Sequence, residues 1–157
     1  MDVAEIEIGQ LAPAFDLPRD GGGSVTLSDS LGKLVVVYFY PKDDSGACLT
    51  ESVDFSALAA KFREAGVMLV GISPDSVKSH DRFKTKRGLS VVLASDENRA
   101  TIEAYGLWVE KSMYGRAYMG VERATFLIGE DGRILNVWRK VRVKGHAEDV
   151  FQKATTR

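Results

Sequence analysis

The sequence predicts an α/β fold in which helices flank a mixed central sheet and an N-terminal β-hairpin precedes it. Two continuous apolar runs, residues 34–40 and 67–72, are rich in β-branched side chains and suit strands covered on both faces. A helical stretch separates them, so the two strands form a βαβ unit and run parallel. Residues 124–128 and 134–138 flank a loop containing Asp-Gly, which predicts a β-hairpin that adds antiparallel strands.

Helices are predicted where the apolar period changes. Apolar residues at helical spacing from Phe55 to Phe62 predict the helix between the parallel strands, with Gly66 as its C-cap. Residues 76–87 predict a second helix, which has Ser76 as N-cap and ends before a glycine.

Shorter segments complete the order of elements. Residues 15–17 and 25–27 surround a glycine-rich loop and predict the N-terminal hairpin. Residues 97–105 predict a short helix, and residues 146–154 predict the last one. By analogy, this order is that of the thioredoxin-like fold, and the length fits one domain over residues 1–157.

Composition excludes several classes of protein. The chain has 21 basic and 22 acidic residues, so its net charge is -1. It therefore lacks the excess of positive charge that is typical of proteins that bind nucleic acid or an anionic membrane. The longest apolar run is too short to span a bilayer, and the first ten residues, with three acids and no lysine or arginine, do not resemble a signal peptide. The single cysteine excludes an intramolecular disulfide and favours a reducing compartment, so we expect a cytoplasmic protein.

No cofactor or metal is expected. The two histidines, His80 and His146, together with one cysteine, show no metal-ligand spacing.

The informative segment is the loop after the first central strand. Cys48 falls in the first turn of the following helix, where unpaired N–H groups and the positive end of the helix dipole favour an anion such as a thiolate. The hydroxyl of Ser45 is placed to bond a peroxide, and Pro41 is placed to shield the thiolate. Arg123, at the start of a later strand, is the best candidate for a guanidinium that stabilises both the thiolate and the oxygen that leaves when a peroxide bond breaks. Glu51 is its expected partner.

Other interpretations of these residues stay open at this point. Cys48 could be an inert buried cysteine, and Ser45 could be the helix N-cap. Arg123 could be a surface residue, with Arg116 and Arg139 as rivals for its role. A further cluster is rich in aromatic residues and methionines. Its default interpretation is packing in the core or at its rim. The alternative is that it forms the wall of an apolar peroxide pocket or a surface that binds a partner. Its members are Tyr105, Trp108, Met113, Tyr114, Tyr118 and Met119.

The same loop resembles a known family. Residues 38–51 closely resemble the peroxiredoxin active-site pattern Pro-x-x-x-Thr/Ser-x-x-Cys, and the likeness extends along nearly the whole chain. Four further stretches look like the Q subgroup, the bacterioferritin-comigratory-protein type: residues 72–76, 113–116, 120–128 and 143–147. The resemblance implies a thiol-dependent peroxidase acting on hydrogen peroxide and organic hydroperoxides. It implies Cys48 as the peroxidatic cysteine, Ser45 as the hydroxyl, Pro41 as the shield and Arg123 as the activating arginine.

The chain departs from this subgroup in its cysteines. Most members carry a second, resolving cysteine, at positions that correspond here to Val53 or lie near Lys84. We therefore expect a one-cysteine cycle resolved by an external thiol such as thioredoxin, glutaredoxin or glutathione, with longer exposure of the sulfenic acid to over-oxidation. The usual Pro-Gly before the cysteine is Gly46-Ala47, which changes the restraints on the loop. The subgroup is commonly monomeric, so a monomer is expected.

There are three alternatives to the peroxidase, one of which is a peroxiredoxin scaffold altered around the active site, by design or by natural divergence, at positions 46, 47, 49 and 84. A dithiol–disulfide oxidoreductase needs Cys-x-x-Cys, which the sequence lacks. A redox-sensing or interaction protein could keep the peroxiredoxin scaffold and show little turnover.

Overall fold

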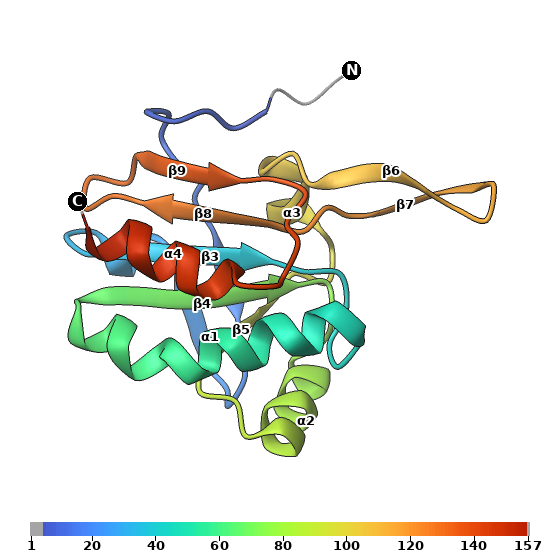
Figure 1. The fold of residues 1–157 in the computed structure, drawn as a ribbon, viewed down its shortest axis with the longest axis horizontal. Coiled ribbons are helices and arrows are strands. Elements are labelled where there is room, and N and C mark those ends of the chain that lie inside the picture. Colours follow the sequence, from blue (N-terminus) through green and yellow to red (C-terminus); the bar gives the residue numbers. More distant parts are fainter. Residues whose placement is uncertain (1–4, 157) are drawn as a thin grey trace.

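A five-stranded mixed sheet forms the centre of the computed structural model, which describes residues 5–156. Its strand order is β5-β4-β3-β8-β9 (Figure 1). The strands are β3 (Leu34–Phe39), β4 (Val67–Ser73), β5 (Val92–Ser95), β8 (Ala124–Ile128) and β9 (Ile134–Trp138). β3 pairs in parallel with β4 and antiparallel with β8, so the mixed sheet predicted from the βαβ unit and the late hairpin is confirmed.

Both faces of β3 are covered, as its continuous apolar sequence predicts. Val35, Val37 and Phe39 pack into the core on one face, together with the N-terminal hairpin. Val36 and Tyr38 pack on the opposite face, beneath the long helices. Each of these five side chains is at most 2% exposed, which is why this strand needs no polar alternation.

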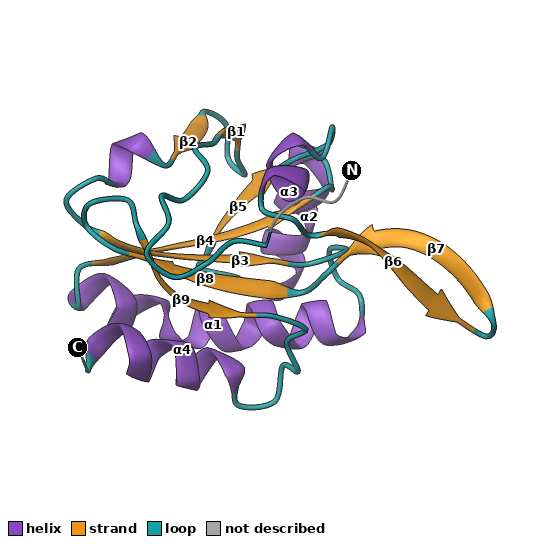
Figure 2. Ribbon diagram, turned by 90° about the horizontal axis from the view of Figure 1, so that it is seen from above, coloured by secondary structure: helices purple, strands orange, loops and turns teal. Residues whose placement is uncertain are grey.

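Helices lie on both sides of the sheet (Figure 2). One side is covered by α1 (Gly46–Glu64) and α4 (His146–Thr155), and Phe83 of α2 (Val77–Arg87) joins the same apolar cluster. The other side is covered by α3 (Ala100–Ala104) and the N-terminal hairpin of β1 (Asp16–Pro18) and β2 (Ser24–Thr26). A short 3₁₀ helix, η1 (Ser28–Ser30), follows the hairpin.

The predicted caps of α2 are present. The side chain of Ser76 accepts a hydrogen bond from the backbone N–H of Ser79, and Gly88 adopts a left-handed conformation at φ 64° that ends the helix. The helix predicted over residues 97–105 is shorter in the structure. Arg99 has a φ of 62°, and the carboxylate of Asp96 accepts from the first N–H groups of α3, so the helix begins only at residue 100.

One hairpin was missed by the sequence analysis. Strands β6 (Trp108–Met113) and β7 (Arg116–Val121) form a separate two-stranded ribbon that projects from the body of the molecule (Figures 1 and 2). The default expectation of core or rim packing for the aromatic and methionine cluster is therefore wrong for most of its members. Tyr105 is fully buried, but Met113, Tyr114, Tyr118 and Met119 are between 44% and 97% exposed.

Across residues 5–156, no helix combines the length and apolar character needed to cross a membrane.

Candidate active site

The candidate site lies where β3 ends and α1 begins. Cys48 is the third residue of α1, and its backbone N–H donates to the carbonyl of Ser45 at 2.7 Å. The side chain is only 2% exposed and belongs to the apolar cluster between the sheet and α1. A thiolate in such surroundings needs a compensating charge, because burial of an unpaired anion is costly.

Arg123 supplies that charge. It lies in the short connection between β7 and β8, and its Nη2 donates to Sγ of Cys48 at 3.2 Å. The same guanidinium donates through Nη1 to Oε1 of Glu51 at 2.7 Å. One planar cation thus bridges the sulfur and a carboxylate, an arrangement that the five fixed donors of arginine allow.

Glu51 holds Arg123 from the next turn of α1. It follows Cys48 by three residues, so both side chains lie on the same face of the helix, and Glu51 is 1% exposed. Burial raises the pKa of Glu51 to about 7, against the opposing attraction of Arg123. Burial also lowers the pKa of Arg123, but Glu51 and the Cys48 sulfur outweigh it and hold that pKa above its ordinary value.

Ser45 and Pro41 lie in the loop that leads to Cys48. Ser45 occupies the N-cap position with extended backbone, yet its hydroxyl makes no capping bond and donates instead to the carbonyl of Lys42 at 2.9 Å. The proton of this hydroxyl is thus directed at the carbonyl of Lys42, while its oxygen keeps two acceptor lone pairs. Pro41 is half-buried, two residues after β3 ends.

The two rival arginines occupy other places. The guanidinium of Arg139 binds both carboxylate oxygens of Glu122, at 2.5 and 3.1 Å. Arg116 is exposed at the start of β7, near the tip of the projecting hairpin. Of the three arginines considered, it is Arg123 that contacts Cys48.

Sequence reasoning missed Lys111, which lies on β6. Its pKa is lowered by burial and by the charge of Arg123, while Cys48 and Glu122 act in the opposite direction. Lys111 therefore lies within the electrostatic field of the candidate site. The sequence signal that could have found it is Gly115, a turn residue between the two segments of the hairpin that carries this lysine; in the structure Tyr114 and Gly115 both have positive φ and close that hairpin.

The alternative interpretation of the aromatic and methionine cluster makes it a wall of an apolar peroxide pocket, and two of its members do line a cavity. Trp108 and Met119 line a cavity of about 670 Å³ at the base of the projecting hairpin. The cavity is not apolar, because Glu110, Glu122 and Arg139 also line it.

The two positions where relatives carry a resolving cysteine hold other residues here. Val53 lies on α1 and is 43% exposed. Lys84 lies on α2, and its Nζ donates to Oδ2 of the buried Asp20 at 2.7 Å. Cys48 is a free thiol and the single cysteine of the chain.

A buried cysteine at a helix start after the central strand, bound by an arginine on a thioredoxin-like fold, defines a thiol-dependent peroxidase. Comparisons with known proteins agree. The profile of the AhpC/TSA family matches residues 8–137. The chain is 45% identical to peroxiredoxin Bcp of Bacillus subtilis, over 94% of each chain. It is 46% identical to peroxiredoxin Bcp of Xanthomonas campestris, over 89% of each chain.

Solved structures give the same result. The bacterioferritin comigratory protein of Xanthomonas campestris, studied for alkyl peroxide reduction, superposes with a TM-score of 0.86 at 42% identity over 90% of each chain. A peroxiredoxin Q variant of Xylella fastidiosa gives 0.90 at 39% identity over 96% of each chain. The chain belongs to the AhpC/TSA family and, within it, to the peroxiredoxins of the Bcp, or Q, type. It differs from a two-cysteine enzyme in lacking a resolving cysteine.

Proposed function

We propose that this peroxidase reduces hydrogen peroxide and organic hydroperoxides in a one-cysteine cycle carried by Cys48. The observation that carries the proposal is the 3.2 Å hydrogen bond from Nη2 of Arg123 to Sγ of Cys48. A guanidinium donates a charge-assisted hydrogen bond to a thiolate, which is the nucleophilic form of cysteine. The alkyl peroxide reduction for which the similar Xanthomonas protein was studied supports organic hydroperoxides as substrates.

In the first step, the Cys48 thiolate attacks the nearer oxygen of the hydroperoxide. An S–O bond forms, the O–O bond breaks, and the distal oxygen takes up one proton from the solvent and leaves as water or an alcohol. Cys48 becomes sulfenic acid, so sulfur is oxidised by two electrons and the peroxide is reduced by two.

The roles of the surrounding residues follow from where charge develops. Arg123 stabilises first the thiolate and then the negative charge on the departing oxygen. Glu51 holds the guanidinium in place through Nη1. The hydroxyl of Ser45 bonds the peroxide, and Pro41 shields the sulfur from water.

In the second half of the cycle, external thiols restore Cys48. A first thiol attacks the sulfenic sulfur, releases water and forms a mixed disulfide. A second thiol attacks that disulfide, frees Cys48 and leaves as the oxidised reductant. Thioredoxin, glutaredoxin and glutathione are the candidate reductants, all of which are present in a reducing cytoplasm, where we place the enzyme as a monomer.

The test is steady-state peroxide consumption with each reductant in turn, using cumene hydroperoxide and hydrogen peroxide. Turnover with at least one reductant, lost in Cys48→Ser, is expected. If Cys48 is oxidised but accumulates as a stable mixed disulfide with every reductant, the one-cysteine cycle is wrong and a redox-sensing role takes its place.

A further inference from the structure

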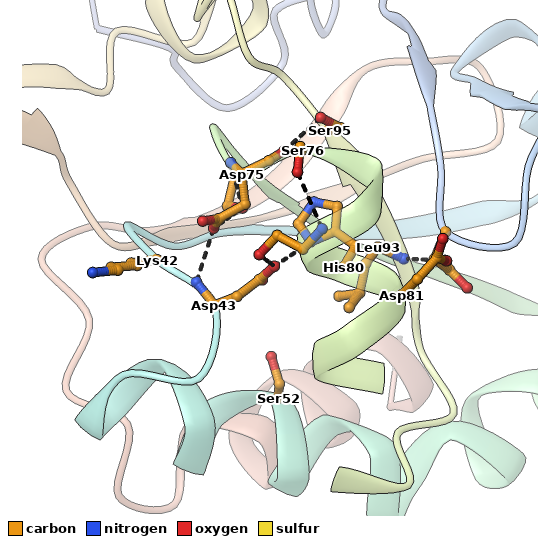
Figure 3. A network of polar contacts seen from close by, with 12 residues as sticks. Lys42, Asp43, Ser52, Asp75, Ser76, His80, Asp81, Leu93 and Ser95 are labelled. Atoms are coloured by element: carbon orange, nitrogen blue, oxygen red, sulfur yellow. Dashed lines mark hydrogen bonds and ion pairs between the residues drawn. The ribbon is translucent and has the colours of Figure 1, made fainter. Parts of the chain in front are cut away.

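His80 is fully buried on α2, outside the site described above, and both of its ring nitrogens face acceptors. Nδ1 lies 2.8 Å from Oδ2 of Asp43, and Nε2 lies 3.0 Å from the backbone carbonyl of Ala94 on β5 (Figure 3). A carbonyl only accepts hydrogen bonds, so Nε2 must carry a proton. A carboxylate also only accepts, so an ionised Asp43 takes a hydrogen bond from a proton on Nδ1, and the two side chains then form an imidazolium–carboxylate pair.

Hydrogen-bond donors surround the side chain of Asp43. Its Oδ1 accepts from the hydroxyl of Tyr40 at 2.6 Å, and its Oδ2 accepts from the hydroxyl of Ser79 at 2.8 Å in addition to the His80 ring. Burial, together with nearby negative charge that includes Asp43, raises the pKa of Tyr40 well above its ordinary value, so Tyr40 stays a donor. Three donors therefore converge on one buried carboxylate.

Asp43 belongs to the loop that carries the active site. It lies two residues before Ser45 and five before Cys48, and its own backbone N–H donates to Oδ2 of Asp75 at 2.8 Å. Figure 3 shows the backbone nitrogen of Asp43 directed at the carboxylate of Asp75 and the carboxylate of Asp43 directed at the His80 ring.

The loop needs such anchors because its backbone is strained. Asp44 has a φ of 58° and Gly46 has a φ of 28°. A non-glycine residue in the left-handed region persists only where its surroundings fix it. The side chains of Lys86 and Arg87 on α2 bind the carboxylate of Asp44 at 2.8 and 2.7 Å. Helix α2 thus holds two consecutive carboxylates of the loop.

We propose that His80 is a positioning residue of the peroxidase site: as an imidazolium paired with Asp43, it fixes the loop that presents Ser45 and the start of α1 to the peroxide. The proposal rests on the proposed function, because the rate that it governs is that of Cys48 with peroxide. It assigns α2 a role in this chain although position 84 of that helix is not a cysteine.

The experiment compares His80→Gln with Lys78→Gln, a matched change of an exposed residue on the same helix. Two rates are measured for each reduced protein: the reaction of Cys48 with cumene hydroperoxide and its alkylation by iodoacetamide. A displaced loop is expected to slow the peroxide reaction of His80→Gln by about tenfold to 100-fold, since this step needs aligned groups around the sulfur. Alkylation needs only an accessible thiolate and should change by less than about threefold. Lys78→Gln should match the unmodified chain in both rates.

Equal peroxide rates in His80→Gln and the unmodified chain would overturn the proposal. Equal losses of the peroxide rate and the alkylation rate in His80→Gln would also overturn it, because they indicate a merely structural role. If His80→Gln does not fold, Ser79→Ala decides the matter, because it removes a single donor to Asp43 and no charge. A lower peroxide rate with unchanged alkylation supports the proposal, and an unchanged peroxide rate overturns it.

Nitrogen-15 NMR of the unmodified chain tests the proton placement independently of any activity. Only two histidines must be assigned, and His146 provides the internal reference. Two protonated nitrogens in the His80 ring at pH 7 are expected, and an unprotonated Nδ1 contradicts the imidazolium. If the unmodified chain itself reacts slowly with peroxide, the proposed function fails, whereas loss of the His80 effect alone leaves that function standing.

Discussion

Arg123 and Cys48 are 75 positions apart in the chain, yet Nη2 of the arginine lies 3.2 Å from the sulfur of the cysteine. The contact depends on the β3–β8 pairing, which brings the residue before β8 to the end of β3 where α1 starts. The antiparallel register of Phe39 with Ala124 fixes this meeting point. The central strand therefore positions both the proposed nucleophile, Cys48, and the guanidinium beside it.

This relationship predicts a large effect of replacing the guanidinium. Arg123→Lys keeps a charge but cannot bind Cys48 and Glu51 together, since an ammonium lacks the planar fork. We expect the second-order rate with peroxide to fall by about 100-fold or more, as loss of one preorganised donor commonly does. Stopped-flow fluorescence measures this rate, and Arg116→Lys on the exposed hairpin is the matched control. A fall of the same size in both variants contradicts a specific role for Arg123.

Glu51 predicts a pH dependence of stability. Its pKa in the fold is raised to about 7 from 4.5, because burial disfavours the charged form. The folded state thus binds the proton more tightly than the unfolded state. The associated stability is fully present below pH 4.5 and is lost as the pH rises through about 7. Urea unfolding between pH 4.5 and 8 should show that the stability of the unmodified chain relative to Glu51→Gln declines as the pH rises, since His146 contributes equally to both proteins. An identical slope in both proteins contradicts the raised pKa.

His146 predicts a slope of the opposite sign. Burial lowers its pKa to about 4 from 6.5, and its Nε2 lies 2.8 Å from Oγ1 of Thr125. The unfolded chain then binds the proton more readily, so this contribution is present above pH 6.5 and is lost as the pH falls towards 4. The loss amounts to on the order of 3 kcal/mol at most.

The His146 contribution is measured best in a Glu51→Gln background, where the opposing slope is removed. Urea unfolding of Glu51→Gln and of Glu51→Gln/His146→Gln is compared between pH 4 and 7. The single variant should lose stability as the pH falls, and the double variant should lose less. If the free energies of unfolding of the two variants change with pH in parallel, the prediction is wrong.

The missing resolving cysteine predicts sensitivity to over-oxidation. Without a nearby thiol, the sulfenic acid of Cys48 waits for an external reductant and meets further peroxide. Mass spectrometry after a peroxide titration without reductant should find gains of about 32 and 48 Da, for sulfinic and sulfonic acid.

Val53→Cys tests the cause, with Val53→Ser as the matched control. A thiol five residues after Cys48 on α1 can trap the sulfenic acid if the start of the helix unwinds. Less sulfinic acid is expected in the cysteine variant than in the serine variant. If mass spectrometry finds no sulfinic or sulfonic acid in the unmodified chain after the peroxide titration, the prediction is wrong.

Much of the fold could be predicted because its strands are buried. The bounds of β8 and β9 match the sequence prediction, and β3 and β4 differ from it by one residue, since continuous apolar runs have one stable placement in a covered sheet. The β6–β7 hairpin escaped prediction for the opposite reason. Its side chains are mostly exposed on both sides, so burial imposes no alternating pattern on its sequence.

Some features of the candidate site could likewise be predicted from the sequence, and others could not. The position of Cys48 at a helix start follows from local sequence, and the family resemblance pointed to Arg123. The orientation of the Ser45 hydroxyl depends on the folded shape of its loop, where it donates to the carbonyl of Lys42. The contact of His80 with Asp43 joins segments 37 residues apart, which local sequence patterns do not encode. The roles in the reaction of all five site residues stay predictions: Cys48, Arg123, Ser45, Pro41 and Glu51.

The most direct test of the central claim is a stopped-flow reaction of fully reduced protein with a stoichiometric amount of peroxide, followed by tryptophan fluorescence. Cys48→Ser is the control, and a free thiol at the same pH sets the reference rate. The account predicts a rate at least about 1000-fold above the free thiol, absent in the control, because the Arg123 contact stabilises both thiolate and leaving oxygen. A rate no faster than that of the free thiol would contradict it and mean that the Gly46-Ala47 loop does not build a working peroxidase site.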